Sequence, residues 1–536
     1  MREVSKEVHF RDRLVSTFVK RDTNFWHAFE KNVKKNPANI AVIDDGVRIS
    51  YEEIYNLAIN QSCHFFQIGI KKGDRVCVLF ENSWPLLIYI LAGLKDGIII
   101  VPLNPKSSIV ENETIINDCT PNSIFFDKLL NINIPEKQKI TSVKYFLNFD
   151  EKILKKNITE NKKSFYVVDE EDPAFILYTS GTTGNPKGAV ITNINIIHSC
   201  LHFQRHFSLS DKDNSILVVP ASHVTGLVAH IMTMFFSGGT LILMKKFDVK
   251  EFLYLAEKEH LTYLIMVPAM YNLCLIRDDL SKYDLSNWRI GCFGGASMPL
   301  GTIKKLKSLL PNLSLVNAYG STETCSPATL MPLKYKNNLI ASVGKVVETG
   351  KIMIMNDNNE QVSIEETGEL WIFGPMVIPG YWKNKKKTSE EFVNGYWKSG
   401  DIGYKDKNGY IYILDRKKDV INRGGYKIYS TEIENLISLS GLVLEVAVIP
   451  HMDSILGEKI HVIIYSDNQS KNLKKLQKLC LKNLSEYKQP DYWTFLDSEL
   501  PKNKNGKILK TLLIDEMEDK LSLIHISEPT RHTDIA

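Results

Sequence analysis

A glycine- and threonine-rich segment that ends in a lysine is the part of the sequence best suited to chemistry. Residues Tyr178 to Gly188 read YTSGTTGNPKG. Unhindered backbone NH groups and hydroxyls donate naturally to phosphate oxygens, and Lys187 adds a mobile positive charge. The most familiar phosphate loop needs two glycines separated by four residues, then Lys and Ser or Thr. Gly181 and Gly184 are three apart and Gly188 follows Lys187, so this segment is expected to bind phosphates in another way.

Six further segments carry residue types that suit the same kind of ligand. In chain order they are FGGASMP (293–299), NAYGSTE (317–323), YWKSGD (396–401), LDRKKD (414–419), RGGYKI (423–428) and PKNKNGKILK (501–510). An aromatic face suits a purine, a carboxylate is a hard-oxygen ligand for Mg²⁺, and an Asp can accept two hydrogen bonds from a vicinal diol. Read singly, each is also an ordinary turn or strand end, so only their combination and order indicate function.

Together, these seven segments resemble the motifs of the AMP-binding, adenylate-forming enzymes, which include acyl- and aryl-CoA synthetases, adenylation domains of peptide synthetases, and luciferases. The resemblance covers the chain from about Trp26 to Lys510. It implies an α/β fold with a large N-terminal domain of parallel and mixed sheets covered by helices, a β-rich subdomain, and a small α+β C-terminal lid domain. It also implies ATP, Mg²⁺ and coenzyme A (CoA) as ligands.

The resemblance assigns a nucleotide site residue by residue. Tyr319 is expected to pack on adenine, Thr322 to meet the α-phosphate, Asp401 to bind both ribose hydroxyls, and Arg416 to lie near ribose and phosphates. The small residues at 294–296 would let a ligand approach the backbone. The residues expected to bind ATP or AMP are Thr179, Ser180, Gly181, Thr182, Thr183, Gly184, Lys187, Gly295, Ala296, Tyr319, Gly320, Thr322, Asp401 and Arg416.

Three residues are expected to act in the chemistry itself, namely Lys507, Lys187 and Glu323. Lys507 would reach into the site during adenylation and contact the carboxylate and α-phosphate oxygens, because a mobile cation lowers the repulsion between two anions. Glu323, with Thr179, is expected to hold Mg²⁺. The sequence departs from the family pattern at Lys510, where the motif often ends in Arg. That departure concerns a secondary contact of residue 510 and does not affect the catalytic role expected for Lys507.

The small domain is expected to move between the two halves of the reaction. The resemblance implies that Gly425 and Lys427 line the channel for the pantetheine arm of CoA once the domain has rotated about a hinge at Lys418. The same rotation would withdraw Lys507. An ordinary hairpin turn explains the segment RGGYKI equally well.

The segment PASHVTGLVAHI, residues 220–231, resembles the stretch that borders the acid in this family. His223, Gly226 and Gly294 are therefore expected in the acid pocket, although a lone His is more often a structural core residue. The segment has no Asp to pair the amine of an α-amino acid, and Asp248 is expected to cap a helix. Apolar residues around the proposed pocket favour a fatty or aromatic acid and could equally be core: Val224, Leu227, Val228, Val267 and Met270.

The predicted reaction has two halves. A carboxylate attacks the α-phosphate of Mg-ATP to give an acyl-adenylate and pyrophosphate, and a thiol then attacks the activated carbonyl as AMP leaves. We expect an acid–CoA ligase for a medium- or long-chain fatty acid. An aryl or other specialised acid–CoA ligase, or a freestanding loader of an acyl carrier protein, remains open. A non-catalytic nucleotide- or acyl-binding regulator is disfavoured by Lys187, Glu323, Asp401, Arg416 and Lys507 occurring together.

Local patterns predict the elements that must position these residues. Up to about residue 350, β-branched runs alternate with amphipathic segments, as in parallel sheets covered by helices. Beyond it, KIMIMNDNNEQ, GELWIFG and GYIYILD predict antiparallel strands joined by turns. Lys-rich stretches such as NKKKTSEEF are interpreted as solvated surface. We predict an AMP-binding domain over 1–415 and a mobile lid domain over 416–520.

The most hydrophobic stretch runs from Trp84 to Leu103. A membrane span needs about 20 apolar residues without charges, whereas Lys95 and Asp96 interrupt this stretch. It is therefore predicted to form a buried helix, a turn at Gly97 and a buried strand, and no transmembrane segment is expected.

Composition narrows the class of protein further. A chain of 536 residues exceeds what one hydrophobic core usually serves, so two or more domains are expected. With 66 basic and 62 acidic residues the net charge is +4, which gives no reason to expect nucleic acid as a partner. Eight scattered cysteines without zinc spacing indicate a reduced, cytoplasmic protein without a structural metal. The oligomeric state stays open.

The last residues, 521–536, differ in character from the charged helix predicted before them. The stretch LSLIHISEPTR resembles an in-frame translation of a transposon-end sequencing adapter. We expect these residues to be an assembly artefact without function, and a genuine disordered tail is the alternative.

Overall fold

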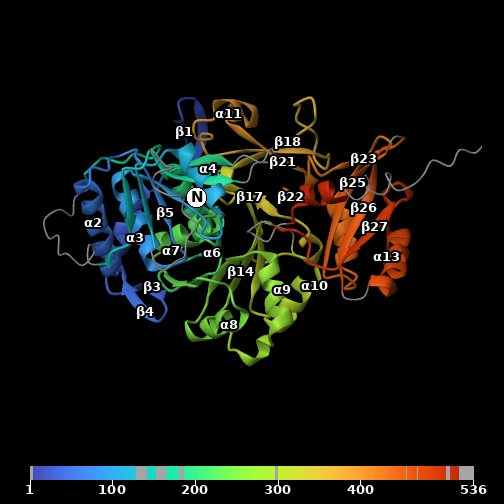
Figure 1. Ribbon diagram of the computed structural model, residues 1–536, viewed down its shortest axis with the longest axis horizontal. Coiled ribbons are helices and arrows are strands. Elements are labelled where there is room, and N and C mark those ends of the chain that lie inside the picture. The colour runs from blue at the N-terminus through green and yellow to red at the C-terminus, as the bar shows by residue number, and fades with distance from the viewer. Residues whose placement is uncertain are drawn as a thin grey trace, which may run out of the picture.

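Five sheets organise the chain in the computed structural model, which describes residues 4–127, 142–151, 165–179, 186–295, 298, 300–453, 455–466, 469–502 and 508–517. Figure 1 shows the N-terminal sheets in blue and green on one side and the C-terminal sheet in orange on the other. The fold is the predicted α/β arrangement of a large N-terminal and a smaller C-terminal domain.

The glycine-rich segment lies in a six-stranded sheet. The strand order is β10 (Lys187–Thr192), β9 (Pro173–Thr179), β6 (Ile99–Pro102), β5 (Arg75–Leu79), β7 (Ser123–Phe126), β8 (Tyr145–Asn148). Neighbours are parallel except β9 and β10, which are antiparallel and pair Thr179 with Lys187. The segment therefore joins two strands, and α6 (Asn193–Phe207) begins only after β10.

A second sheet and its helices complete the first half of the N-terminal domain. Its order is β11 (Asn214–Leu217), β12 (Thr240–Leu243), β3 (Ile40–Asp44), β4 (Val47–Ser50), with the first three parallel. The helices of this half are α1 (Phe25–Lys35), α2 (Tyr51–Gln67), α3 (Trp84–Asp96), α4 (Ile109–Cys119), the π-helix η2 (Thr225–Met232) and α7 (Thr233–Ser237). The hairpin of β1 (Val4–His9) and β2 (Arg13–Phe18) forms a separate two-stranded sheet.

A ten-stranded mixed sheet carries three of the predicted nucleotide residues in its strands: Tyr319, Asp401 and Arg416. Its parallel part is β13 (Tyr263–Met266), β14 (Ile290–Phe293), β15 (Ser314–Tyr319), packed with α8 (Val249–Lys258), α9 (Pro268–Arg277) and α10 (Leu300–Leu309). Its antiparallel part is β16 (Thr329–Leu330), β17 (Gly344–Val346), β22 (Tyr410–Arg416), β21 (Tyr396–Lys405), β19 (Gly368–Phe373), β18 (Lys351–Met355), with β20 (Phe392–Val393) on β21. The predicted change from parallel to antiparallel pairing near residue 350 begins somewhat earlier, at β16.

The C-terminal domain has its own sheet and cores. The order is β24 (Tyr426–Ile428), β23 (Ile421–Arg423), β26 (Gly457–Tyr465), β25 (Glu445–Asp453), with β27 (Tyr492–Leu496) parallel to β26. Helices α12 (Ser430–Ser438) and α13 (Gln469–Asn483) pack with this sheet around a buried aliphatic cluster. The predicted domain boundary after residue 415 falls one residue before the end of β22.

The hydrophobic stretch folds as predicted into helix α3, a left-handed turn at Gly97 with φ of 67°, and strand β6. Lys95 and Asp96 are both buried, and the Lys95 ammonium lies 3.1 Å from the Ser62 hydroxyl and 3.4 Å from the Asp96 carboxylate. The two charges are therefore compensated inside the domain. No described helix combines the length and the apolar character needed to cross a membrane.

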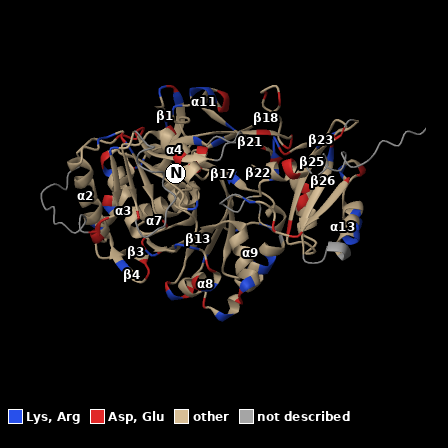
Figure 2. Cartoon of the chain, viewed as in Figure 1, with Lys and Arg blue, Asp and Glu red and all other residues tan. Residues whose placement is uncertain are grey.

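Charges of both signs share the surface. Figure 2 shows Lys and Arg beside Asp and Glu along the outer helices and loops of the described residues. This distribution agrees with the small net charge of +4.

Candidate active site

The carboxyl ends of β13, β14 and β15 open on one edge of the mixed sheet. Ligands of open α/β sheets bind outside the carboxyl ends of parallel strands. At this edge Gly294 approaches the next strand so closely that a Cβ would stand 2.5 Å from the Ala318 carbonyl oxygen. Gly295 follows with φ of 78°, a left-handed conformation that favours glycine. The edge thus presents backbone rather than side chains, as the motif FGGASMP predicted.

Tyr319, Asp401 and Arg416 form one hydrogen-bonded group. The Tyr319 hydroxyl donates to Asp401 Oδ2 at 2.5 Å, and Arg416 Nε lies 2.7 Å from Asp401 Oδ1. The antiparallel register of β21 and β22 places Asp401 directly opposite Arg416. Burial, aided by Asp401, raises the pKa of Tyr319 well above its usual value, so the phenol keeps its proton. Tyr319 therefore meets two residues of neighbouring strands that lie more than 80 positions away in the sequence.

A second group gathers around Glu323. This residue lies in a 3₁₀ turn over Thr322–Thr324, which Ser321 caps by accepting a hydrogen bond from the Glu323 amide. The carboxylate is 7% exposed and accepts from the Ser321 hydroxyl at 2.6 Å and from the Tyr381 hydroxyl at 2.9 Å. It is thus oriented by two hydroxyls, rather than being an exposed carboxylate at the start of a helix.

Lys187 belongs to the same group. Its ammonium lies 2.7 Å from Glu391 Oε1, 3.5 Å from the Tyr381 hydroxyl, and 4.7 Å from the centre of the Tyr381 ring. Neither Tyr381 nor Glu391 was among the predicted site residues. Glu391 falls in the stretch NKKKTSEEF, which was interpreted as solvated surface, and for this residue that interpretation is wrong. The pairing joins residues 204 positions apart.

The oxygen atoms of Glu323 and Thr179 are the predicted ligands of Mg²⁺. Glu323 offers two carboxylate oxygens, which together have about four lone-pair sites, so its two hydroxyl donors leave acceptor capacity. The Thr179 hydroxyl makes only a long contact, 3.5 Å, to the Lys187 carbonyl oxygen. A carboxylate and a hydroxyl are ligand types that Mg²⁺ prefers, so these residues fit the ion.

Within the described part of the chain, another cluster has ligand types suited to a metal. Glu7, His9 and Glu170 bring one ligand atom each within 4.8 Å of one another. Arg21, however, pairs with Glu7 at 2.6 Å and with Glu170 at 2.8 Å. The Arg21 guanidinium already pairs with both carboxylates, so the cluster is explained as an ion-pair network that anchors the β1–β2 hairpin.

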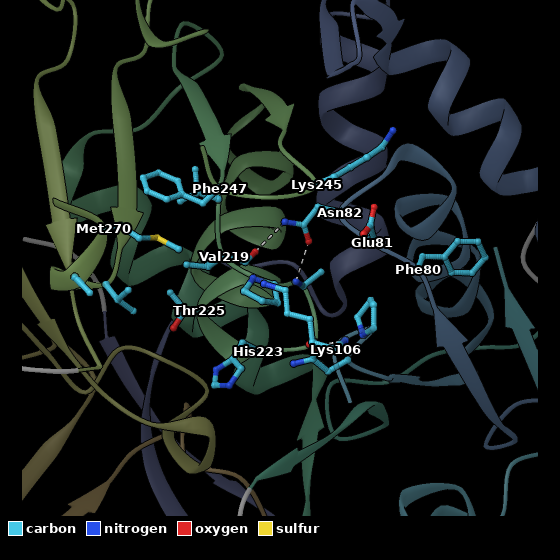
Figure 3. A pocket seen from close by; sticks show the side chains of 18 of the residues that line it. Phe80, Glu81, Asn82, Lys106, Val219, His223, Thr225, Lys245, Phe247 and Met270 are labelled. Carbon is cyan, nitrogen blue, oxygen red and sulfur yellow. Dashed lines mark hydrogen bonds between the residues drawn. The ribbon is translucent and has the colours of Figure 1, made fainter. Parts of the chain in front are cut away.

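A cavity of about 250 Å³ lies beside the π-helix η2. Asn82 shapes its wall by donating to the Val219 carbonyl oxygen and accepting from the Ala221 amide (Figure 3). It also donates to the carbonyl oxygens of Leu217 and Met244. The lining is mainly apolar or aromatic, with charged residues as well: Phe80, Glu81, Asn104, Pro105, Lys106, Val218, Val219, Pro220, Ala221, Lys245, Phe247, Val267, Met270 and Leu273.

His223 lines this cavity, as predicted for the acid pocket, and burial lowers its pKa so that the ring is neutral at pH 7. Gly226 and Gly294 are not among the lining residues. A Cβ on Gly226 would lie 2.2 Å from the Pro220 carbonyl oxygen, so this glycine permits close backbone packing at the start of η2.

The five apolar residues proposed around the acid pocket divide into two sets. Val267 and Met270 line the cavity. Val224, Leu227 and Val228 are buried members of the main hydrophobic core and are not among the lining residues. Asp248 caps α8 as predicted, by accepting a hydrogen bond from the Glu251 amide at 3.0 Å.

The cavity comes close to the sheet edge at the Gly295 turn. Val267 lines the cavity, and its Cγ1 atom lies 4.0 Å from the position of a Cβ on Gly295. Gly294 touches Ala318, and the next residue, Tyr319, begins the hydrogen-bonded group with Asp401 and Arg416. The cavity and the Tyr319–Asp401–Arg416 group are therefore separated by the turn at Gly294 and Gly295.

The predicted lid residues lie at the domain boundary. Gly425 forms the exposed tip of the β23–β24 hairpin with φ of 88°, so the segment is indeed a hairpin turn. The Lys427 ammonium is 2.9 Å from Asp357 Oδ2 of the N-terminal domain. Lys418 is exposed in the turn between the domains. Lys510 pairs with Glu434 at 2.7 Å and donates to Ser430, all within the C-terminal domain.

Several predicted residues lie outside the described part of the chain. They are Ser180, Gly181, Thr182, Thr183, Gly184, Ala296 and Lys507, and the adapter-like stretch 521–536 also falls there. Of the remaining predicted ligands, Gly320 stands where a Cβ would be 3.1 Å from Thr324 Oγ1, and Thr322 is buried.

Known proteins match the chain over both domains. The family model for the AMP-binding enzyme covers residues 29–382, and that for the AMP-binding enzyme C-terminal domain covers residues 432–507. The chain is 28% identical over 481 residues to a 2-succinylbenzoate–CoA ligase of Bacillus licheniformis, covering 90% of this chain and 98% of that protein. It is 29% identical to the long-chain-fatty-acid–CoA ligase FadD13 of Mycobacterium tuberculosis, covering 88% and 93%.

Solved structures agree with this match. The ATP-bound MatB of Rhodopseudomonas palustris superposes with a TM-score of 0.84 at 25% identity, covering 93% of this chain and 99% of that one. A family model that matches more than half of the chain, together with the shared fold, settles the relationship. The chain therefore belongs to the AMP-binding family of adenylate-forming enzymes, the family that its motifs predicted.

Proposed function

We propose that the protein activates a medium- or long-chain fatty acid as an acyl-adenylate with Mg-ATP and transfers the acyl group to CoA, releasing AMP and pyrophosphate. The observation that carries the proposal is the apolar cavity that meets the Gly295 turn beside the Tyr319–Asp401–Arg416 group. An acyl chain in the cavity would direct its carboxylate towards a nucleotide held on the sheet edge. The eight free, buried cysteines support a reducing, cytoplasmic setting.

In the first half-reaction a carboxylate oxygen attacks the α-phosphorus and the bond to pyrophosphate breaks. The chain needs no nucleophile of its own for this step, because orientation and charge neutralisation supply the rate enhancement. Asp401 would hold the ribose, Tyr319 the adenine, and Lys187 the β- and γ-phosphates. Lys507 would reduce the repulsion between the two reacting anions. Mg²⁺, held by Glu323 and Thr179, would add positive charge near the phosphates.

In the second half-reaction the thiol of CoA attacks the acyl carbonyl and AMP leaves with its phosphate. The proposal requires the C-terminal domain to turn about Lys418, so that Lys507 withdraws and the Gly425–Lys427 hairpin approaches the site. The contact between Lys427 and Asp357 supports a mobile arrangement, because both side chains are more than half exposed and such pairs are weak.

A second candidate is an aryl or other specialised acid–CoA ligase. Phe80 and Phe247 line the cavity and could stack on an aromatic ring, and one relative is named for 2-succinylbenzoate. A freestanding loader of a carrier protein would share the first half-reaction and differ only in the thiol. The joint presence of Lys187, Glu323, Asp401 and Arg416 in two organised groups disfavours a regulator without catalysis.

The deciding experiment is a panel of saturated acids of graded chain length and of aryl acids, assayed with ATP and CoA for AMP and thioester formation. A fatty-acid ligase should show a maximum at one chain length, with aryl acids weak. A maximum on aryl acids would support the second candidate, and acid-dependent pyrophosphate exchange without CoA-dependent thioester would support a carrier-protein loader.

One pair of variants sharpens the assignment of the cavity. Met270→Trp should fill part of the lining and shift the maximum to shorter acids. Ile276→Trp, on the same helix but 73% exposed, should leave the chain-length profile unchanged. Identical chain-length profiles for the two variants would show that this cavity is not the acid pocket.

A further inference from the structure

Glu391 and Lys187 make an ion pair that the predicted reaction does not explain. Glu391 is the last residue of α11 (Lys385–Glu391), and Lys187 is the first residue of β10. Their charged atoms lie 2.7 Å apart, and the side chains are only 26% and 16% exposed. An ion pair shielded from water to this extent is stronger than a surface pair, since neighbouring protein replaces much of the screening solvent.

Tyr381 connects this ion pair to Glu323. Its hydroxyl oxygen lies 2.5 Å from Glu391 Oε2 and 2.9 Å from Glu323 Oε1. A phenol has one proton, so it can donate to only one of the two carboxylates at a time. The Lys187 ammonium, 3.5 Å from the same oxygen, supplies the positive charge that lets two carboxylates share one hydroxyl. Two anions, one cation and one phenol thus form a single unit.

The backbone supports this unit from several elements. The Tyr381 amide donates to the Thr388 hydroxyl of α11 at 3.0 Å, and the neighbouring Trp382 amide donates to the Gly188 carbonyl oxygen at 2.7 Å. The Ile378 amide donates to the Glu323 carbonyl oxygen at 3.0 Å. The segment 378–382 is therefore tied both to the strand that carries Lys187 and to the turn that carries Glu323.

A lysine at the end of a glycine-rich segment has several rotatable bonds, and fixing it costs conformational entropy. Glu391 uses one of the three N–H groups of the ammonium and leaves others for a ligand. Building on the proposed function, we propose that Glu391 is a positioning residue for adenylation. It holds Lys187 beside Glu323, ready for the triphosphate of Mg-ATP, and Tyr381 connects the two sides.

The alternative arrangement makes the opposite prediction. If Glu391 were a counter-ion that the triphosphate must displace, removing its charge would free Lys187 and tighten nucleotide binding. If Glu391 positions Lys187, removing its charge should weaken nucleotide binding. Without Glu391, part of the binding free energy would be used to order the Lys187 side chain.

The test compares Glu391→Gln with Glu390→Gln. Both residues lie on α11, but Glu390 is 43% exposed and pairs with Lys387 of the same helix. In acid-dependent pyrophosphate exchange, Glu391→Gln should raise KM for ATP about tenfold and leave KM for the acid unchanged. Glu391→Asp should recover part of the loss, Tyr381→Phe should give a smaller rise, and Glu390→Gln should match the wild type.

Two further measurements separate this proposal from the proposed function. Thioester formation from supplied acyl-adenylate should be unaffected in Glu391→Gln, since no triphosphate takes part. Calorimetric binding of Mg-ATP to the full chain needs no acid, so it remains informative if no acid on the panel is activated. An affinity for Mg-ATP that is unchanged or increased in Glu391→Gln would overturn the positioning role, and a KM for the acid that rises equally would do the same.

Discussion

The two sides of the predicted active site are held by contacts of different kinds. On the N-terminal side, Asp401 is 4% exposed, and the strand register places it opposite Arg416. On the C-terminal side, Lys427 reaches Asp357, and these side chains are 61% and 65% exposed. The first contact joins a buried carboxylate to a partly exposed guanidinium within one sheet, whereas the second crosses between domains through water-exposed groups.

The difference indicates which half of the site is preorganised. Breaking a fully buried pair by removing one partner is strongly destabilising, whereas an exposed pair contributes about 0–1 kcal/mol. The Asp401–Arg416 pair lies between these limits, because Asp401 is buried and the Arg416 side chain is 38% exposed. A second cavity, of about 540 Å³, separates the domains around the exposed pair and is lined by Asp357, Glu369, Lys417, Asn422 and Lys427. The predicted nucleotide side is therefore held by contacts within one sheet, and the predicted lid side is held by contacts that can exchange at little cost.

The comparison predicts its largest effect at Lys507, on the lid. Lys507→Ala should reduce adenylation by about 100-fold or more, because a preorganised charge aimed at the reacting anions is lost. Thioester formation from supplied acyl-adenylate should persist, since the other lid face serves that step. Pyrophosphate exchange and single-turnover thioester assays measure the two halves. Lys504→Ala is the control, and equal loss of both halves would contradict a lid with two roles.

The next effect is expected on the fixed side. Asp401→Asn should lower the free energy of unfolding by about 2–3 kcal/mol, because Arg416 loses a buried partner and the Tyr319 hydroxyl loses an ionised acceptor. KM for ATP should rise in pyrophosphate exchange. Urea unfolding measures the first effect. An Asp401→Asn protein as stable as the wild type would show that the fixed side does not depend on this pair.

Acid should act more strongly on the N-terminal domain than on the C-terminal domain. Burial lowers the pKa of His198 and of His230 to about 3, and that of His461 in the C-terminal domain to about 4. These rings stay neutral in the folded state while the unfolded chain takes up protons below about pH 6.5. The stability that these neutral rings contribute is therefore complete above about pH 6.5. It is lost as the pH falls from there towards the pKa values of the folded state.

Each such histidine should cost about 1 kcal/mol per pH unit below 6.5. Hydrogen exchange at pH 7 and pH 5, resolved by domain, measures the difference. In His230→Gln the loss of N-terminal stability between these pH values should be smaller. Equal losses of stability in the two domains between pH 7 and pH 5 would contradict a stronger effect of acid on the N-terminal domain.

The smallest effect is expected at the exposed contact. Asp357→Asn removes an ion-pair partner of Lys427 and one of two partners of Lys417, which also contacts Glu369. It should change the free energy of unfolding by about 0–1 kcal/mol. Adenylation should be nearly unchanged, and the approach of the hairpin to the site should become slightly easier. Comparing the rates of the two half-reactions in this variant and in Asp401→Asn tests the contrast directly. A loss of stability as large as that of Asp401→Asn would mean that the domains are locked.

Local patterns predicted much of the fold. The buried helix, the turn at Gly97 and strand β6 followed from an apolar stretch with a glycine in it, because helix ends and turns depend on neighbouring residues. The helix cap at Asp248 was predictable for the same reason. The Lys187–Glu391 pair was not, because a glutamate in a Lys-rich stretch looks like any solvated charge until the chain brings β10 beside it.

The sequence by itself determined the family and the residue types of the site, since the motifs lie within short segments whose chemistry is legible locally. The tertiary structure alone decided which of these residues meet. It paired Asp401 with Arg416 through strand register, brought Tyr381 and Glu391 to Lys187, and separated Gly226 from the cavity that His223 lines. The physical reason is that such contacts depend on long-range packing and burial, which no local pattern records.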